Sequence, residues 1–299
     1  CQERRSGMDV RTAPLSGGSF SPHRIADRMI PGRDGLPALE LIEAGPEGPR
    51  TGAPILFLHG AFGGAWMWRE IFMPYFARRG RASLAVSVRG HGNSEGLAEL
   101  RNWGLSDYLD DIRRVFAELD EAPVVIAHSL GGLLAQMLIG REPMRALALL
   151  GSLPPEGLML ESPRLAITDT PIWIEAFVGS MAQKKLPIAL AAHRILFSEG
   201  LPRERVMQYS ARMTPESPRA LADAHLPLPV ASAFLYAIPT LVMRGAEDRL
   251  VWQASALRTA LYHGAAYRMA EAQGHFLQLD IGAETVARNV MAWIDGLDL

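Results

Sequence analysis

Residues Val124–Gly132 read Val-Val-Ile-Ala-His-Ser-Leu-Gly-Gly, and this stretch decides the fold of the chain. Its β-branched apolar run stops at Ser129 and a helix-forming segment follows at once, a pattern typical of a strand-to-helix turn that holds a Ser at the tip of a sheet. Such a turn gives the Ser a strained, positive φ, so the residues two before and two after it must be small. Ala127 and Gly131 meet this requirement, although Ala stands where Gly is usual. An ordinary strand-turn-helix with a capping Ser is the alternative interpretation.

The composition is that of a protein with a substantial buried core. The 299 residues are 48% hydrophobic and 21% charged, which suits one large α/β domain with an insertion or two small domains. The formal net charge of −2 does not show the excess of basic residues that is typical of proteins that bind nucleic acid or an anionic membrane. No apolar run reaches the length of about 18 residues that a transmembrane helix needs. The single cysteine, Cys1, argues against an intramolecular disulfide and a Cys-based metal site.

The N-terminal stretch gives the only indication of cellular location. Residues 1–20 are polar and contain Arg, without the apolar core of a signal peptide. We therefore expect a cytoplasmic protein. A mature lipoprotein that carries its lipid on Cys1 is the alternative, and an upstream extension before Met8 explains the same stretch more simply.

Short β-rich runs alternate with helical patterns, which predicts a mostly parallel sheet with helices on both faces. Strands are expected at residues 38–44, 54–58, 82–88, 124–127, 146–150, 238–243 and 265–269. Helices between them are expected at residues 65–79, 105–119, 130–140, 252–262 and 281–297.

The alternation breaks once, over residues 152–236, which we call the insertion. This segment is rich in Pro, Met and aromatic residues, and short helices are expected at residues 171–182, 187–197, 203–212 and 217–224. Ligands of open α/β sheets bind at the carboxyl ends of the strands, so helices inserted there would cover the site. The expected organisation is a flexible arm (1–22), an α/β core (23–151 and 237–299) and a helical cap (152–236).

A Ser hydroxyl is a weak nucleophile, and it needs a base that a third group orients. His275 has the best setting for the base, because it follows a predicted strand and precedes the last helix. Asp248, with Glu247 beside it, follows the preceding strand and is the candidate acid, although it could instead cap the helix that begins near Trp252. The order Ser129, Asp248, His275 is the one expected for this turn. Other His residues are expected on the surface or in the insertion: His193, His225 and His263.

An oxyanion formed by attack of the Ser needs backbone donors. One candidate is the N–H of Leu130, directly after the Ser. The other is the N–H of Ala61 in the stretch His59–Phe62, where Gly60 would let the backbone approach a substrate closely. A simple turn after the strand is the alternative interpretation of this stretch.

Together these segments resemble the α/β-hydrolase superfamily over roughly residues 38–295. The resemblance rests on the segments His59–Phe62, Arg89–Ser94, Ala127–Gly132, Gly245–Asp248 and Gly274–His275. It implies an α/β-hydrolase fold with a catalytic triad of Ser129, Asp248 and His275 and an oxyanion hole of Ala61 and Leu130. Ser87 stands where this family usually has an Asp, and we expect little functional consequence because that turn is structural.

The resemblance implies a cofactor-independent serine hydrolase that cleaves a carboxylic ester of a small or medium-sized substrate through an acyl-enzyme. A Ser nucleophile argues against the haloalkane dehalogenases and epoxide hydrolases of this fold, which use Asp there. Thioesterase, lactonase and C–C bond hydrolase activities remain alternatives, as does a small-ligand receptor that retains the triad. No metal and no nucleic-acid partner are expected. The residues expected to contact the substrate are Phe62, His128, Trp173 and Phe177.

Overall fold

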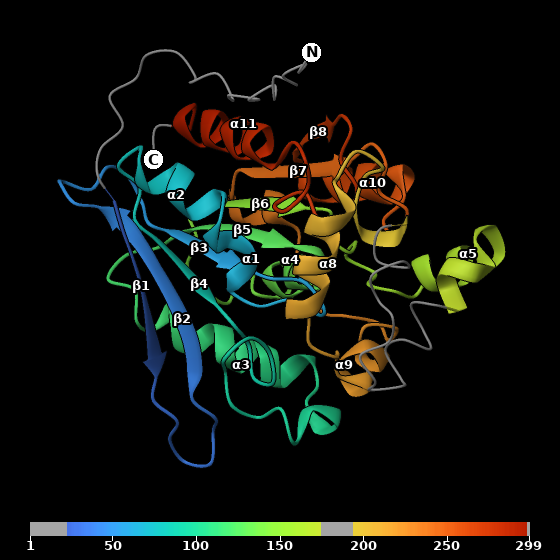
Figure 1. Ribbon diagram of the computed structural model, residues 1–299, viewed down its shortest axis with the longest axis horizontal. Helices are drawn as coiled ribbons and strands as arrows, with labels where there is room; N and C mark the ends of the chain where they lie inside the picture. The colour runs from blue at the N-terminus through green and yellow to red at the C-terminus, as the bar shows by residue number, and fades with distance from the viewer. Residues whose placement is uncertain (1–22, 175–193, 298–299) are drawn as a thin grey trace, which may run out of the picture.

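Eight strands form one sheet at the centre of the computed structural model, which describes residues 23–174 and 194–297 (Figure 1). The strands lie in the order β1-β2-β4-β3-β5-β6-β7-β8. Their bounds are β1 His23–Ile30, β2 Leu39–Pro46, β3 Ile55–Leu58, β4 Ser83–Val86, β5 Val124–His128, β6 Ala146–Leu150, β7 Thr240–Gly245 and β8 Ala266–Ala270. β2 is antiparallel to both of its neighbours, and the pairs from β4 to β8 are parallel, as predicted.

Helices cover both faces of the sheet. One face carries α1 (Trp66–Arg69), α2 (Phe72–Ala77) and α11 (Ala283–Asp295), and the other carries α3 (Leu105–Phe116), α4 (Ser129–Met137) and α10 (Gln253–His263). Successive side chains of a strand point to opposite faces. In β3, Phe57 therefore joins the first layer while Leu56 joins the second, and both are fully buried.

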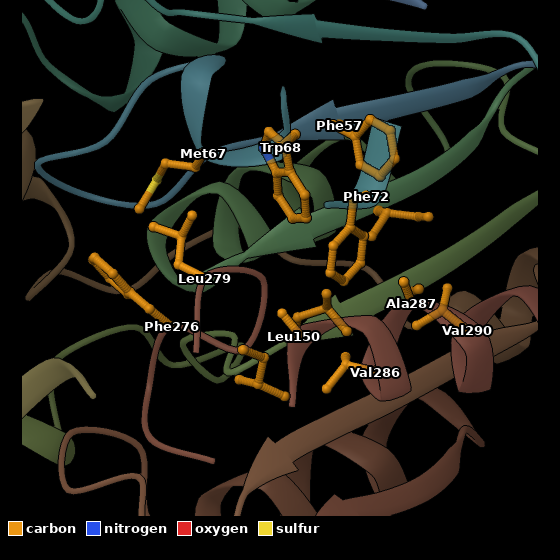
Figure 2. Close-up of a cluster of buried hydrophobic side chains, with 14 of the residues drawn as sticks. Phe57, Met67, Trp68, Phe72, Leu150, Phe276, Leu279, Val286, Ala287 and Val290 are labelled. Carbon is orange, nitrogen blue, oxygen red and sulfur yellow. The ribbon is translucent and has the colours of Figure 1, made fainter. Parts of the chain in front are cut away.

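An aromatic cluster anchors the carboxyl end of β3 against the helices (Figure 2). The rings of Phe57 and Trp68 stack with centroids 4.8 Å apart, and Phe72 meets Trp68 edge-on at 5.3 Å. Figure 2 shows these rings on the opposite side of the cluster from Val286 and Val290 of α11. Close packing of this kind gives the loop that follows β3 a rigid base.

The insertion contains α5 (Glu161–Thr168), α8 (Arg203–Arg212), α9 (Pro218–Asp223) and the 3₁₀ helix η2 (Ala233–Tyr236). The predicted helix at 203–212 has those bounds, and α9 corresponds to the one predicted at 217–224. The helix predicted at 171–182 is present up to residue 174, where description stops. Most of the one predicted at 187–197 lies outside the described residues, as does the predicted arm over 1–22. The division into arm, core and cap stays a prediction.

Backbone hydrogen bonds on either side of α8 join the insertion to two loops of the sheet. Before α8, the Leu196 carbonyl accepts a hydrogen bond from the Phe276 N–H at 2.9 Å. After α8, the Thr214 N–H donates to the Phe62 carbonyl at 3.1 Å. The insertion is thereby joined to the loop that follows β3 and to the loop that follows β8.

Several elements differ from the sequence prediction. β1 was not predicted, because this edge strand is half exposed and its polar and apolar residues do not alternate cleanly. The single helix expected at 65–79 is divided into α1 and α2 at Ile71, and Pro74 in the first turn of α2 lacks an N–H to continue a helix from before it. α5 was also not predicted. Within the described ranges, no helix is long and apolar enough to cross a membrane.

Candidate active site

Ser129 lies at the turn between β5 and α4. β5 ends at His128, α4 begins at Ser129, and the φ of Ser129 is 51°. The predicted positive φ is therefore present, in a region that costs a non-glycine residue about 1–2 kcal/mol. This turn leaves the side chain at the carboxyl end of the central strands, 8% exposed.

Ser129, His275 and Asp248 form a hydrogen-bonded chain. Ser129 Oγ lies 2.8 Å from His275 Nε2, and His275 Nδ1 lies 2.9 Å from Asp248 Oδ2. A carboxylate only accepts, so Nδ1 carries the imidazole proton and Nε2 is free to accept the proton of the Ser hydroxyl. The His and the Asp are 2% and 4% exposed. The structure therefore brings together the three side chains that the sequence predicted, in a geometry suited to activation of a Ser.

The second oxygen of the Asp248 carboxylate organises its own loop. Oδ1 accepts the N–H groups of Leu250 and Val251 at 2.9 and 3.0 Å. α10 begins later, at Gln253, without a side-chain cap, so Asp248 is not the cap of this helix. Glu247 is exposed and accepts a hydrogen bond from a backbone N–H outside this loop. The structure therefore separates the two neighbouring carboxylates clearly.

The loop after β3 is pressed against Ser129. A Cβ added to Gly60 would lie 2.8 Å from the Ser129 Cβ, and one added to Gly131 would overlap the carbonyl of His59. Only Gly fits at these two close approaches. Among the described residues, the N–H groups of Ala61 and of Leu130 have no hydrogen-bond partner.

His59 holds the start of this loop. Its Nε2 accepts the Val88 N–H at 3.2 Å, so Nδ1 carries the proton and donates to the Gly60 carbonyl at 2.8 Å. Burial, helped by the nearby His91, lowers the pKa of His59 to about 4. The imidazole is therefore neutral at physiological pH and keeps both hydrogen bonds.

The residues expected to contact a substrate have different surroundings. Phe62 is half-buried with a φ of 64°, and His128 is fully buried with its ring centroid 4.8 Å from that of His275. Trp173 is half-buried, and its indole N–H donates to Ser162 Oγ at 3.1 Å. Phe177 lies outside the described residues. Their contact with a substrate stays a prediction.

Glu40 supplies a carboxylate that sequence reasoning did not identify. Its Oε2 accepts the hydroxyl of Ser87 at 2.6 Å and the N–H of Asn93 at 3.0 Å. Glu40 on β2 therefore provides, from the neighbouring strand, the negative charge that an Asp at position 87 would supply. The signal was an acidic residue between two apolar residues of the predicted strand, Leu39 and Leu41.

Asp280 fastens the loop that carries His275. It accepts the N–H of Gly274 and the N–H and hydroxyl of Ser198, each at 2.7 Å. Asp280 is 2% exposed, so this carboxylate is committed to the tie between the insertion and the loop. No local sequence pattern indicates that Asp280 bonds Ser198, because the two residues are 82 positions apart.

Glu216 in the insertion is the other buried carboxylate near the site. It is 1% exposed and accepts the Tyr108 hydroxyl at 2.8 Å and the Phe62 N–H at 3.4 Å. It lies between prolines in Thr-Pro-Glu-Ser-Pro, a stretch that gives no sequence signal of burial.

His263, expected on the surface or in the insertion, is instead buried at the end of α10. Its Nδ1 accepts the Ala233 N–H at 3.0 Å, and its Nε2 donates to Gln136 Oε1 at 3.0 Å. Burial lowers the pKa of His263 to about 4. Its role is to join α10 and α4. The predicted helix ended at residue 262, so the prediction did not place His263 on the buried face of that helix.

Comparisons with known sequences identify a family. The model of the alpha/beta hydrolase family matches residues 55–288, which include the turn at Ser129 and the loops of Asp248 and His275. A mouse sn-1-specific diacylglycerol lipase, ABHD11, is 31% identical over 98 residues, which are 32% of this chain and 31% of the lipase. This match spans about a third of that relative's length.

Solved structures share the fold over most of the chain. An esterase from Exiguobacterium antarcticum, EaEST, has a TM-score of 0.71 at 18% identity and covers 89% of this chain and 98% of its own. A bromoperoxidase from Bacillus anthracis has a TM-score of 0.70 at 16% identity and covers 90% of this chain and 100% of its own. At these identities the likeness establishes the fold alone.

Proposed function

The chain belongs to the alpha/beta hydrolase family, and on that premise we propose that it is a serine hydrolase acting on a carboxylic ester through an acyl-enzyme. The observation that carries the proposal is the unbroken chain of hydrogen bonds from Ser129 through His275 to Asp248. This order and geometry are those of a nucleophile, a general base and an orienting acid. The substrate is a small or medium-sized ester.

In the acylation step, Ser129 Oγ attacks the ester carbonyl carbon while His275 Nε2 accepts the hydroxyl proton. The tetrahedral intermediate collapses when the same imidazolium gives this proton to the leaving alcohol. Asp248 keeps the proton on Nδ1 and stabilises the imidazolium. Water then attacks the acyl-enzyme with His275 as base, and the carboxylic acid and free Ser129 are released.

The N–H groups of Ala61 and Leu130 stabilise the negative charge on the oxygen of the tetrahedral intermediate. Both are free to donate among the described residues, and Gly60 brings the first of them close to Ser129. Loss of a single donor of this kind typically costs about 10²–10³ in kcat. Leu130 lies in the first turn of α4, where the helix dipole adds a favourable potential for an anion.

The insertion is proposed to act as a cap that selects the acyl group. It is joined to the loops after β3 and β8, which carry Ala61 and His275. Trp173 and Phe62 are proposed to contribute apolar surface to the acyl side of the site, together with Phe177. Apolar walls of this kind favour aliphatic or aromatic acyl groups.

A test compares the purified protein with Ser129→Ala on p-nitrophenyl esters of increasing acyl length, on thioesters and on lactones. Ester hydrolysis that disappears in a folded Ser129→Ala protein supports the proposal, and a fluorophosphonate should then label the wild type at Ser129. Unchanged hydrolysis in that variant contradicts it. Preference for thioesters or lactones selects one of those alternative hydrolases, and tight binding without turnover selects a receptor.

A further inference from the structure

Glu216 is a buried acid of the insertion that contacts the loop after β3, residues 59–63, which we call the oxyanion loop. Its Oε2 accepts the Phe62 N–H at 3.4 Å and lies 3.2 Å from His91 Nε2. Its Oε1 accepts the Tyr108 hydroxyl at 2.8 Å and the Ser217 N–H at 2.7 Å. With four donors around it, the carboxylate is held in one orientation.

The charge of Glu216 is balanced inside the protein. Burial alone would raise the pKa of Glu216, but the charge and hydrogen bond of His91, with the other donors, lower it overall. Burial would likewise lower the pKa of His91, and Glu216 outweighs this effect and raises it. The two groups form an ion pair, and both side chains are at most 1% exposed.

Phe62 is the residue through which this carboxylate reaches the candidate site. The Gly63 N–H donates to the Gly60 carbonyl at 3.2 Å and closes a turn with Phe62 in third place. Its φ of 64° in that place is typical of a type II turn, which favours Gly or Asn. Phe62 keeps this conformation while Glu216 accepts its N–H and Thr214 donates to its carbonyl at 3.1 Å.

The orientation of one peptide plane depends on these contacts. A relaxed, negative φ at Phe62 would convert the turn to type I and flip the peptide between Ala61 and Phe62. The Phe62 N–H would then point away from Glu216. The flipped peptide carries the Ala61 carbonyl, and the Ala61 N–H belongs to the preceding Gly60–Ala61 peptide. The two peptides share the Ala61 Cα, so a loop freed to flip at Phe62 holds the Ala61 N–H less firmly relative to Ser129, which lies against Gly60.

We propose that Glu216 is a positioning residue of the oxyanion hole: the insertion supplies the carboxylate that fixes Phe62 and, through it, the Ala61 N–H. The proposal rests on the hydrolase function proposed above. Catalysis then requires residues 214–216 to keep their contacts with Phe62, in addition to any contact that the insertion makes with the substrate.

The test compares Glu216→Gln with Ser217→Ala in the full chain, with p-nitrophenyl acetate as substrate. Ser217 is adjacent and buried, and its bond to Glu216 comes from the backbone N–H, which Ala keeps. Its hydroxyl donates to the Trp103 carbonyl and caps α9. Glu216→Gln should lower kcat about 10- to 100-fold, less than deletion of an oxyanion donor, with KM within about 3-fold. Ser217→Ala should keep kcat within about 2-fold, although it loses a helix cap.

Hydrogen exchange provides a readout that does not depend on the reaction. The amides of residues 60–63 should exchange faster in Glu216→Gln than in the wild type and Ser217→Ala. Equal exchange in all three proteins, or equal kcat for Glu216→Gln and the wild type, would overturn the proposal. Failure of the hydrolase proposal is distinguishable, because it appears as hydrolysis that persists in Ser129→Ala while exchange at 60–63 still reports on Glu216.

A double-mutant cycle separates positioning from general stabilisation. Gly adopts positive φ freely, so in a Phe62→Gly background the kcat loss from Glu216→Gln should shrink at least about 5-fold. Losses that simply multiply would contradict the proposal. If Glu216→Gln does not fold, Glu216→Asp replaces it, because its shorter carboxylate keeps the charge beside His91 but withdraws from Phe62. Wild-type kcat in that variant would equally overturn the proposal.

Discussion

The Nε2 atom of His128 lies 3.0 Å from the carbonyl oxygen of His275. A carbonyl only accepts, so Nε2 carries the proton, and Nδ1 has no hydrogen-bond partner among the described residues. Burial lowers the pKa of His128 well below 6.5, and the neighbouring imidazole of His275 lowers it further. The residue before the candidate nucleophile is thus a neutral donor that fixes the backbone of the candidate base.

Replacing this donor should weaken both catalysis and folding. His128→Phe keeps a ring but leaves the His275 carbonyl buried without its partner, at a cost of about 1–3 kcal/mol in the free energy of unfolding. We expect a fall in kcat of at least about 10-fold, since small displacements of a catalytic group can cost up to about 10². His128→Gln, which can still donate, should recover part of the activity. Equal kcat in the Phe and Gln variants would argue against this role.

Loss of charge should affect kcat strongly at Asp248 and hardly at all at Glu247. Asp248→Asn should lower kcat by roughly 10⁴, because the amide favours the wrong tautomer of His275. Glu247→Gln should leave kcat nearly unchanged, since Glu247 is exposed and bonds elsewhere. Steady-state kinetics of the two purified variants decide the matter, and a larger loss in Glu247→Gln would refute the assignment of the acid.

Gly131 should tolerate no side chain. A Cβ at this position would overlap the backbone carbonyl of His59, so Gly131→Ala must push the oxyanion loop away from α4. We expect at least about a 100-fold fall in kcat, comparable with the loss of an oxyanion donor. Gly48→Ala is the matched control, because a Cβ there meets nothing within 4 Å. Comparable kcat in the two variants would mean that the loop adapts without consequence.

The stability of the protein should fall in mild acid because of His263. Its pKa is lowered from the ordinary 6.5 to about 4 in the folded protein, because the imidazole is buried. Between these two values the unfolded chain binds a proton that the folded protein does not, so the stabilisation present above pH 6.5 is lost as the pH falls. From pH 7 to pH 5 this residue should account for about 2 kcal/mol of the decrease in unfolding free energy.

Urea denaturation of the wild type and His263→Gln at pH 7 and pH 5 measures this contribution. The variant should lose less stability between the two pH values, even though it is less stable at pH 7 through its weakened bonds to Ala233 and Gln136. The same pH dependence in both proteins would show that His263 titrates normally.

The insertion should determine the preferred acyl length. Trp173→Ala should shift the chain-length profile of ester hydrolysis, in graded steps of about 1–3 kcal/mol per methylene, because apolar pockets discriminate weakly. Ile167→Ala is the control, since that side chain is 84% exposed. Position 176, which would extend such a scan, lies outside the described residues. An unchanged profile in Trp173→Ala and its neighbours would assign specificity to the core loops.

Local patterns predicted the parts of this molecule whose determinants are local. β6 and α8 lie at the predicted bounds, because each is a continuous run of one periodicity. The turn at Ser129 was recognised because steric demands within a few residues dictate its small neighbours. β1 was not recognised, since its pairing with β2 depends on a partner that the strand's own half-exposed sequence does not reveal.

The buried acids show the limit of sequence reasoning most clearly. Glu40, Glu216 and Asp280 each meet partners from distant segments, with separations of 47, 125 and 82 residues for Ser87, His91 and Ser198. Burial of a carboxylate is favourable only with donors around it, and the identity of those donors follows from the packed fold. Asp248 was found only because the order of the three triad residues supplied the missing non-local information.

The contacts of Ser198 and Glu216 with the core limit which segments of the insertion can be replaced by those of a relative. A replacement segment spliced between β6 and β7 from a relative would lack Ser198 and Glu216. It would change the proposed substrate entrance and at the same time remove the bonds that hold the loops of His275 and Ala61. An exchange confined to residues 170–195 would keep these contacts, and also the bonds of Glu161 and Arg164 to the loop after β7, while it varies the proposed entrance. Chimeras built on the two designs should therefore differ in whether activity survives, even when both fold.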